Sequence, residues 1–199
     1  MERELLITGI GGQGVQLAGQ VLARAATLEG RYVMLFGLYG GMMRGGNTDG
    51  TVVIGDTPLL TPPIVSRSWS AIAMHDEFWA PIEPKLRPGA LVLVNDATFT
   101  HEISAPCEVH RVDATGIATE LGHPLGGSMV MAGAYAGITA IVGPDALVEA
   151  MRRSIPSYRT QHIAANERAI RAGLDAVAPG TFPAWNGGRA TPHRASMRP

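Results

Sequence analysis

The stretch LLITGIGGQGVQLAG, residues 5–19, decides the fold of this chain. An apolar run at Leu5–Ile7 leads into a cluster of four glycines, and small and apolar residues then recur at the spacing of one helix face. Gly30 is placed to end that helix. The stretch therefore predicts a strand, a tight turn and a helix.

Further apolar and β-branched runs follow at 32–36, 51–54, 71–74 and 91–94. Two of them, in AIAMHDE (71–77) and ALVLVND (90–96), end in acid-rich residues, as buried parallel strands do where they emerge at the carboxyl edge of a sheet. We therefore expect an α/β fold, Rossmann-like, with a mostly parallel sheet and flanking helices.

The second half of the chain is predicted to be helical. Helical stretches are expected at 114–121, in the small-residue segment 128–143, at 144–155, and from Ile163 to Leu174. From Pro179 onward Pro, Gly and Arg occur without a period. We predict one domain over residues 1–178 and an extended or disordered tail over 179–199.

Composition excludes several classes of protein. The net charge of -1 gives no reason to expect a nucleic-acid partner, and no basic stripe interleaved with aromatic residues precedes the tail. Cys107 is the only cysteine, so the chain alone makes no disulfide and no cluster held by several thiolates. No signal peptide and no run of about 18 apolar residues is present. A cytoplasmic protein is the expectation.

The first glycines, Gly9, Gly11 and Gly14, match G-x-G-x-x-G between a strand and a helix, where backbone N–H groups can approach a phosphate. A conventional dinucleotide site also needs an acid at the end of the second strand, and MLFGLYGG (34–41) has none. A P-loop is excluded because no Gly-Lys-Ser/Thr occurs. The alternative is that Gly12 and Gly14 only permit a tight crossing, although Gln13 is an odd choice for packing.

A second glycine-rich segment, YGGMMRGGNTDG (39–50), surrounds Arg44. Its glycines allow positive φ angles and close approach, and the guanidinium of Arg44 suits phosphate or carboxylate. A binding loop and a solvated surface loop are equally compatible with these residues.

Together these segments carry a resemblance. GIGGQGVQLAGQVLARAATLEGRYV (9–33), followed by residues 39–65, is similar to the gamma subunit or domain of the thiamine-diphosphate-dependent 2-oxoacid:acceptor oxidoreductases. The similarity continues through ALVLVND and the Met/Gly/Ala helix to NERAIRAG (166–173). Met43–Gly46 looks most like the 2-oxoglutarate branch. The family often has proline and glutamate at Gly41 and Met42 and asparagine at Ser128, which leaves the substrate open.

The resemblance implies a subunit that is not catalytic alone, in a complex that converts a 2-oxoacid and coenzyme A to an acyl-coenzyme A and carbon dioxide. Alpha and beta subunits would carry thiamine diphosphate and Mg²⁺, and a ferredoxin-like subunit the Fe-S clusters. The final acceptor is either ferredoxin or NAD through a flavin-bearing partner. No cofactor is expected on this chain alone.

Candidate contacts to a cofactor or partner are concentrated in the two glycine-rich segments and at one strand end. They are Gly11, Gly12, Gln13, Gly14, Tyr39, Arg44, Gly45 and Asn95. No catalytic and no metal-binding residue is assigned. His75, Asp76 and Glu77 suit an acid–base or metal group, but Asp76 as a helix cap is favoured. Trp185 in the tail suits either a partner surface or disorder.

Two other functions compete with this interpretation. One is a stand-alone Rossmann-like protein that binds a nucleotide and acts as an oxidoreductase or sensor. The other is a structural adaptor whose glycines only pack. The small positions of the 128–143 segment, such as Gly133 and Gly137, favour close helix packing in the core or between subunits.

Overall fold

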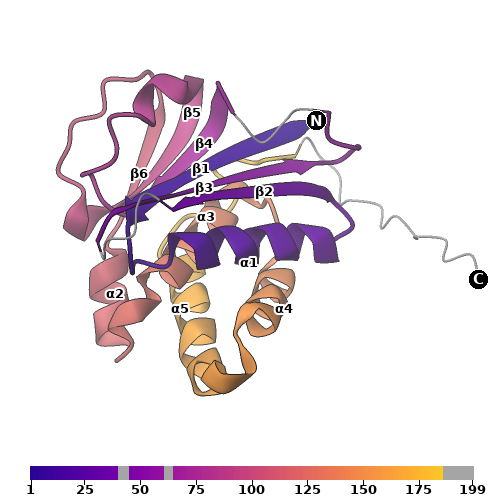
Figure 1. The fold of residues 1–199 in the computed structure, drawn as a ribbon, viewed down its shortest axis with the longest axis vertical. Coiled ribbons are helices and arrows are strands. Elements are labelled where there is room, and N and C mark those ends of the chain that lie inside the picture. The colour runs from indigo at the N-terminus through magenta and orange to yellow at the C-terminus, as the bar shows by residue number, and fades with distance from the viewer. Residues whose placement is uncertain (40–44, 61–64, 186–199) are drawn as a thin grey trace, which may run out of the picture.

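The computed structural model describes residues 1–39, 45–60 and 65–185 (Figure 1). Arg44 therefore lies outside the described residues. The strands are β1 (Glu2–Ile10), β2 (Tyr32–Tyr39), β3 (Asn47–Gly55), β4 (Ser68–Ala73), β5 (Leu86–Asn95) and β6 (Glu108–Val112). The α-helices are α1 (Val15–Leu28), α2 (Ala114–Glu120), α3 (Gly127–Thr139), α4 (Pro144–Ser154) and α5 (Ile163–Asp175). Short 3-10 turns are η1 (Glu83–Lys85), η2 (Asp96–Thr98), η3 (Pro124–Gly126) and η4 (Ser157–His162).

The strands form one sheet in the order β2-β3-β1-β4-β5-β6 (Figure 1). β1, β4, β5 and β6 pair in parallel, whereas β3 runs antiparallel to both β1 and β2. The predicted α/β class, the mostly parallel sheet and the helical C-terminal part are confirmed. β3 begins earlier than the apolar run at 51–54, because Asn47 pairs with Ile10 and the ladder overrides the weak strand preference of Asn and Gly.

The two faces of the sheet are covered differently (Figure 1). The α-helices pack on one face, where Leu5, Ile7 and Ile72 join the larger apolar core. The other face is covered by connections that bring in Trp79 and Phe99, whose rings meet edge to face with centroids 5.4 Å apart. A doubly wound sheet has helices on both faces. The connections replace the second helical layer here.

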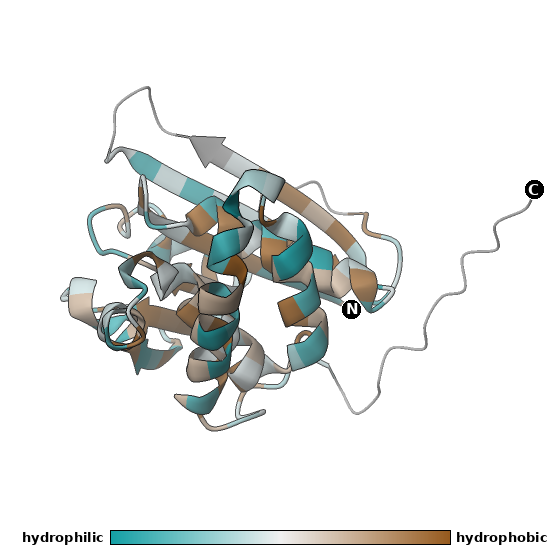
Figure 2. Ribbon diagram, turned by 90° about the horizontal axis from the view of Figure 1, so that it is seen from below, coloured by the Kyte–Doolittle hydropathy of each residue, from teal (hydrophilic) through white to brown (hydrophobic). Residues whose placement is uncertain are grey.

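Helix α3 is central to the helical layer, and Met129, Val130 and Met131 on it are completely buried. A Cβ on Gly133 would overlap the carbonyl oxygen of Ile170, and one on Gly173 would overlap that of Val130. The small residues of α3 therefore serve close packing against α5 within this chain. Figure 2, viewed from the helix side, shows helices that carry both hydrophobic and hydrophilic residues, as amphipathic helices do.

The chain beyond α5 packs back onto the end of α3. Gly180, Phe182 and Ala184 donate backbone hydrogen bonds to successive carbonyl groups from Gly137 to Thr139, and Ala184 is fully buried. Trp185 donates to the carbonyl of Ile141 and lies under the guanidinium of Arg31, 3.7 Å from the ring centroid. Trp185 therefore packs against this chain itself, which neither predicted alternative, a partner surface or disorder, anticipated. The predicted state of residues 186–199 lies outside the described residues.

Candidate functional site

The carboxyl ends of β1, β4 and β5 meet at one edge of the sheet, where the first glycine loop lies. Ligands of open α/β sheets bind at this edge because the loops that follow the parallel strands gather there. The backbone N–H of Gly11 donates to the carbonyl of Gly46 at 2.8 Å. This bond brings the two glycine-rich segments of the sequence together.

Different structural constraints require glycine at different positions of the first loop. A Cβ on Gly9 would come 2.8 Å from Cβ of Met74, and one on Gly14 would overlap the hydroxyl of Ser128. Gly14 also has φ of 79° at the start of α1. Gly12 has φ of 103°, and no described atom lies within 4 Å of the position a Cβ would take. Packing therefore accounts for Gly9 and Gly14, whereas at Gly12 the positive φ is the reason for glycine that the described residues give.

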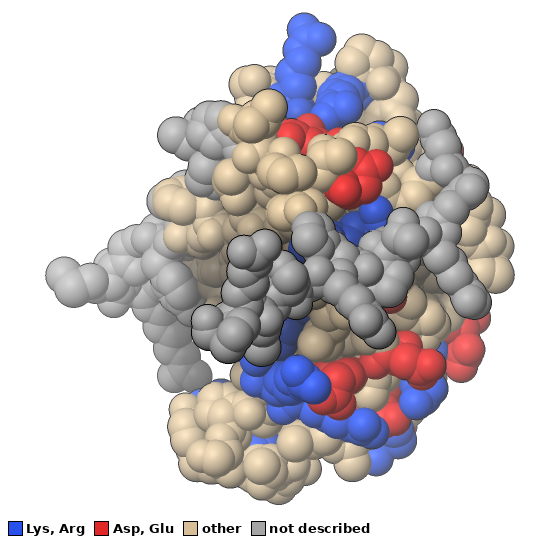
Figure 3. Space-filling model, turned by 90° about the vertical axis from the view of Figure 1, so that its right-hand side faces the viewer, with Lys and Arg blue, Asp and Glu red and all other residues tan. Residues whose placement is uncertain are grey.

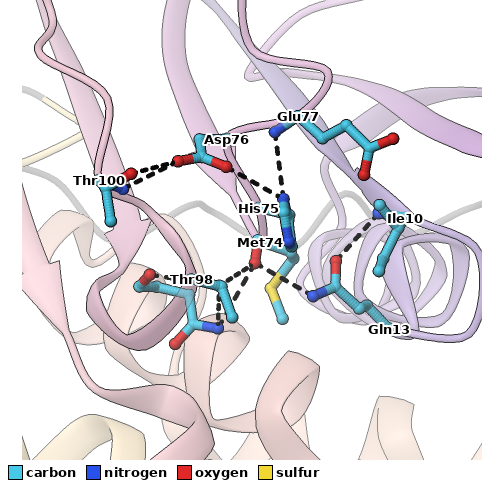
Figure 4. A network of polar contacts seen from close by, with 9 residues as sticks. Ile10, Gln13, Met74, His75, Asp76, Glu77, Thr98 and Thr100 are labelled. Carbon is cyan, nitrogen blue, oxygen red and sulfur yellow. Dashed lines mark hydrogen bonds and ion pairs between the residues drawn. The ribbon is translucent and has the colours of Figure 1, made fainter.

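Gln13 holds the loop in place. Its Oε1 accepts from the backbone N–H of Ile10 at 3.0 Å, and its Nε2 donates to the carbonyl oxygen of Met74 at 3.3 Å (Figure 4). The side chain therefore bridges the glycine loop and the end of β4. This bridge explains an amide within a turn that packing alone does not require.

The carbonyl of Met74 is shared by several donors (Figure 4). Besides Gln13, it accepts from the hydroxyl of Thr98 at 2.6 Å and from Nδ2 of Asn95 at 3.4 Å. Asn95 is almost fully buried; its Nδ2 also donates to the hydroxyl of Thr115, and its Oδ1 accepts from the backbone N–H of Thr115. Asn95 thus has partners on both amide atoms. Its predicted contact with a cofactor stays a prediction.

Two further predicted site residues, Tyr39 and Gly45, are among the described residues. Gly45 has φ of 89° with no described atom near its would-be Cβ, and Tyr39 ends β2 opposite Thr48 of β3. Thr48 is 4% exposed, and its hydroxyl has no hydrogen-bond partner among the described residues. The structure thus brings Gly11 to Gly14 and Gly45 together, with Asn95 one loop away.

The interpretation of Asp76 as a helix cap was wrong, because the described chain forms turns after it. Its carboxylate accepts instead from the backbone N–H and hydroxyl of Thr100, at 3.0 and 2.8 Å (Figure 4). These two hydrogen bonds lower the pKa of Asp76. Nδ1 of His75 accepts from the N–H of Glu77 at 3.1 Å. Within the described residues, no group of three or more His, Cys, Asp or Glu could hold a metal ion.

The order of the strands bears on the dinucleotide alternative. A conventional site needs the second strand beside the first, so that its terminal acid reaches the ribose. Here antiparallel β3 separates β2 from β1, which moves the end of β2 about 4.8 Å farther from the glycine loop. Both the missing acid and this displacement argue against an ordinary nicotinamide site.

Sequence reasoning missed Thr98, Thr115 and the carbonyl of Met74, because only the fold brings them together. Ser128 carried a signal: the resemblance marked it as a departure from the family's asparagine, and it lies directly against Gly14.

The fold and this glycine-loop edge define an α/β protein with a mostly parallel sheet, and its relatives identify the family. The chain belongs to the pyruvate ferredoxin/flavodoxin oxidoreductase family, whose sequence pattern matches residues 4–176. It is 33% identical to pyruvate synthase subunit PorC of Methanothermobacter marburgensis, covering 77% of this chain and 86% of that one. It is 32% identical to 2-oxoglutarate synthase subunit KorC of Methanothermobacter thermautotrophicus, covering 91% and 98%.

A solved structure agrees with the architecture. The pyruvate oxidoreductase subunit PORC of Thermotoga maritima superimposes with a TM-score of 0.73 at 26% identity, over 88% of this chain and 96% of that one. The resemblance inferred from the glycine-rich segments is therefore confirmed.

Proposed function

We propose that this chain is the gamma subunit of a complex that oxidatively decarboxylates a 2-oxoacid and transfers the acyl group to coenzyme A. The observation that carries the proposal is the similarity to KorC over nearly the whole of both chains. In this proposal the complex works in the cytoplasm. No described helix is long and apolar enough to cross a membrane.

The donor atoms of this chain do not fit the redox groups that the reaction needs. A cluster of the Fe-S type needs about four thiolates, and Cys107 is the only cysteine. Burial and the carboxylate of Glu83 raise the pKa of Cys107, which keeps it a thiol. We therefore assign no electron-transfer step to this chain. Alpha and beta subunits with thiamine diphosphate and a ferredoxin-like Fe-S subunit are the proposed partners.

The glycine-loop edge is the part of the chain that we assign to the coenzyme A region. Among the described residues nothing lies within 4 Å of the position that a Cβ would take at Gly12 or Gly45, and the Met74 network fixes the loop from behind. Backbone without side chains, together with an arginine, suits a phosphate-bearing ligand, and Arg44 directly precedes Gly45 in the sequence. The chain would enclose the ligand against its partner subunits, with Gly11, Gln13, Gly14, Tyr39 and Asn95 lining or supporting the contact.

The proposal also ranks the 2-oxoacids that the complex could use as substrate. The Met43–Gly46 sequence favours 2-oxoglutarate, and the two relatives described above are a 2-oxoglutarate synthase subunit and a pyruvate synthase subunit at nearly equal identity. We therefore place 2-oxoglutarate first and pyruvate second, with branched and aromatic 2-oxoacids as the further members of a test panel.

The deciding experiment is native mass spectrometry of the tagged chain purified from its own cells, with thiamine diphosphate and iron assayed in the same sample. The proposal expects a large assembly that contains both, and a coenzyme A-dependent activity with one 2-oxoacid. A lone particle near 20.9 kDa that binds a dinucleotide would overturn it in favour of the nucleotide-binding alternative.

The role of Arg44 has its own test in the assembled enzyme. Arg44→Ala is expected to raise the KM for coenzyme A about tenfold, equivalent to about 1.4 kcal/mol. Unchanged assembly together with an unchanged KM would remove Arg44 from the proposed site.

A further inference from the structure

Charge is unevenly distributed along this chain. The segment from 152 to 171 contains five arginines and one carboxylate, although the whole chain carries a net charge of -1. The segment spans the end of α4, the η4 turn and most of α5. These arginines form no continuous basic stripe in the sequence, because they are spread over three elements.

The fold gathers these residues with one arginine from α1. Arg152 and Arg171 both donate to the carboxylate of Glu167, at 2.6 and 2.9 Å. Arg24 of α1 donates to the carbonyl of Arg153 at 2.9 Å. The ends of α1 and α4 and the outer side of α5 thus form one surface, here named the arginine face. It consists of Arg24, Arg152, Arg153 and Arg171, and we include in it the exposed Arg159 of η4 and the exposed Arg168, which is next to Glu167 on α5.

The arginine face keeps an excess of positive charge after its internal ion pairs are counted. Glu149 pairs with Arg153, and Glu167 is shared by two arginines. No described carboxylate pairs with Arg24, Arg159 or Arg168. Guanidinium groups stay charged at any physiological pH. The excess charge is therefore permanent.

An exposed aromatic ring lies within the same segment. Tyr158 is 73% exposed, and the guanidinium of Arg159 lies 5.5 Å from its ring centroid. Tyrosine and arginine are enriched at protein interfaces, because each buries a large area and keeps a polar tip.

From these observations we propose that the arginine face binds a carboxylate-rich surface of a partner protein within the oxidoreductase complex. The inference rests on the proposed function, which supplies the complex. Complementary charge favours such a partner and orients it. Glu149 and Glu167 lie among the arginines, and Figure 3 shows blue and red side chains interleaved on the lower part of the molecule. Mixed charge suits a protein surface better than a uniform polyphosphate or lipid surface, which both carboxylates would repel.

The lysine content of the chain allows a direct test. Lys85, in η1 on the other face of the sheet, is the only lysine. Arg168→Lys keeps the charge of the arginine face and adds one amine to it. We would treat the purified complex with a carbodiimide, which joins amines to carboxylates, and identify cross-linked peptides by mass spectrometry. The unsubstituted complex, which offers only the amines of Lys85 and Met1 on this chain, is the control.

The proposal expects new cross-links from position 168 to Asp or Glu residues of one partner subunit. Cross-links confined to this chain, in a complex that is otherwise intact, would overturn the arginine-face proposal and leave the proposed function standing. Cross-links to phospholipid or nucleic acid phosphate in place of protein carboxylate would also overturn it. Failure of the unsubstituted chain to enter any complex would overturn the proposed function itself.

Charge reversal gives a second measurement. In the pair Arg159→Glu and Arg168→Glu, neither arginine has a described carboxylate partner, so the isolated chain should unfold at the same temperature. In native mass spectrometry the double variant should retain at least tenfold less partner than the unsubstituted chain, because the reversed charges repel the partner's carboxylates. The partner retained by the unsubstituted chain should also fall as salt is added, because salt screens exposed ion pairs. The pair Arg67→Glu and Lys85→Glu, which reverses two other exposed cations, is the matched control. Equal retention by the double variant and the control would overturn the proposal.

Discussion

The two ends of the parallel strands in this sheet are built in opposite ways. At the amino ends, the carboxylate of Glu4 is almost buried, pairs with Arg87 and accepts from the backbone N–H of Trp69. The hydroxyl of Ser70 donates to the carbonyl of Glu4 and contacts the hydroxyl of Tyr135 at 2.8 Å. Side chains fill the space at this end, and their polar groups form hydrogen bonds and an ion pair with one another and with the backbone.

The carboxyl ends are built from glycine and short polar side chains instead. No described atom lies within 4 Å of the position that a Cβ would take at Gly12 or Gly45, and one carbonyl, that of Met74, fixes the loops behind them. The comparison indicates that the polar packing of the amino end contributes stability, and our proposal assigns the contact with a ligand or partner to the carboxyl end. Each variant below breaks one end and should leave the other unaffected.

The largest effect is expected from Glu4→Ala at the amino end. The substitution leaves the N–H of Trp69 without an acceptor in a buried position and removes the partner of Arg87. The free energy of unfolding should fall by about 3 kcal/mol, measured by urea denaturation of the purified chain. The KM for coenzyme A of whatever complex assembles should not change. A stability within about 0.5 kcal/mol of the original would contradict this assignment.

Gly14→Ala at the carboxyl end is expected to cost about 2 kcal/mol, because its Cβ would overlap Ser128 and because the residue has a positive φ. Gly122→Ala is the matched control, with φ of 69° and no described atom near its would-be Cβ. It should show the cost of backbone strain alone. Adding Ser128→Ala should restore part of the loss in the Gly14 variant, and an absence of any rescue would show that the overlap is unimportant.

Tyr135→Phe should cost about 1.5 kcal/mol through the lost hydrogen bond to Ser70. Burial raises the pKa of Tyr135 above that of an exposed phenol, so the folded chain holds this proton more tightly than the unfolded chain. The stability that this group contributes is complete below about pH 10 and is lost as the pH rises further. Urea denaturation at pH 8 and above pH 10 should show the difference between the two proteins shrinking. A constant difference would place the phenol in a more solvated setting.

Gly12→Ala should have the smallest effect on stability, about 1 kcal/mol from backbone strain, equal to that of Gly122→Ala. Its effect should appear in the assembled enzyme, as a KM for coenzyme A raised about tenfold with kcat nearly unchanged. If Gly12→Ala leaves the KM unchanged, as the control Gly122→Ala should, the glycine loop does not face the coenzyme at Gly12.

Much of this architecture was predictable because it depends on local periodicity. The run at Leu5–Ile7, the glycines after it and the apolar face of α1 predicted a strand, a turn and a helix, and these are present. The buried strands at 71–74 and 91–94 and the helices of the second half were predicted in the same way. The glycine-rich segments also sufficed to identify the family.

Other features depend on contacts between residues far apart in the chain. Asp76 was expected to cap a helix, but it holds Thr100, because the connection after β4 folds over the sheet instead of entering a helix. The early start of β3 follows from its pairing with β1 and β2. The arginine face was likewise invisible in the sequence, since α1, α4 and α5 meet only in the folded chain.

The sequence by itself determined the class of fold, the glycine loop and the family, because burial on one side of a strand or helix imposes a period that the residues record. The tertiary structure alone decided that β3 lies between β1 and β2, that Ser128 supports Gly14, and that Gln13, Asn95 and Thr98 share the carbonyl of Met74. The physical reason is that each of these contacts depends on where a distant segment lies after the core has packed.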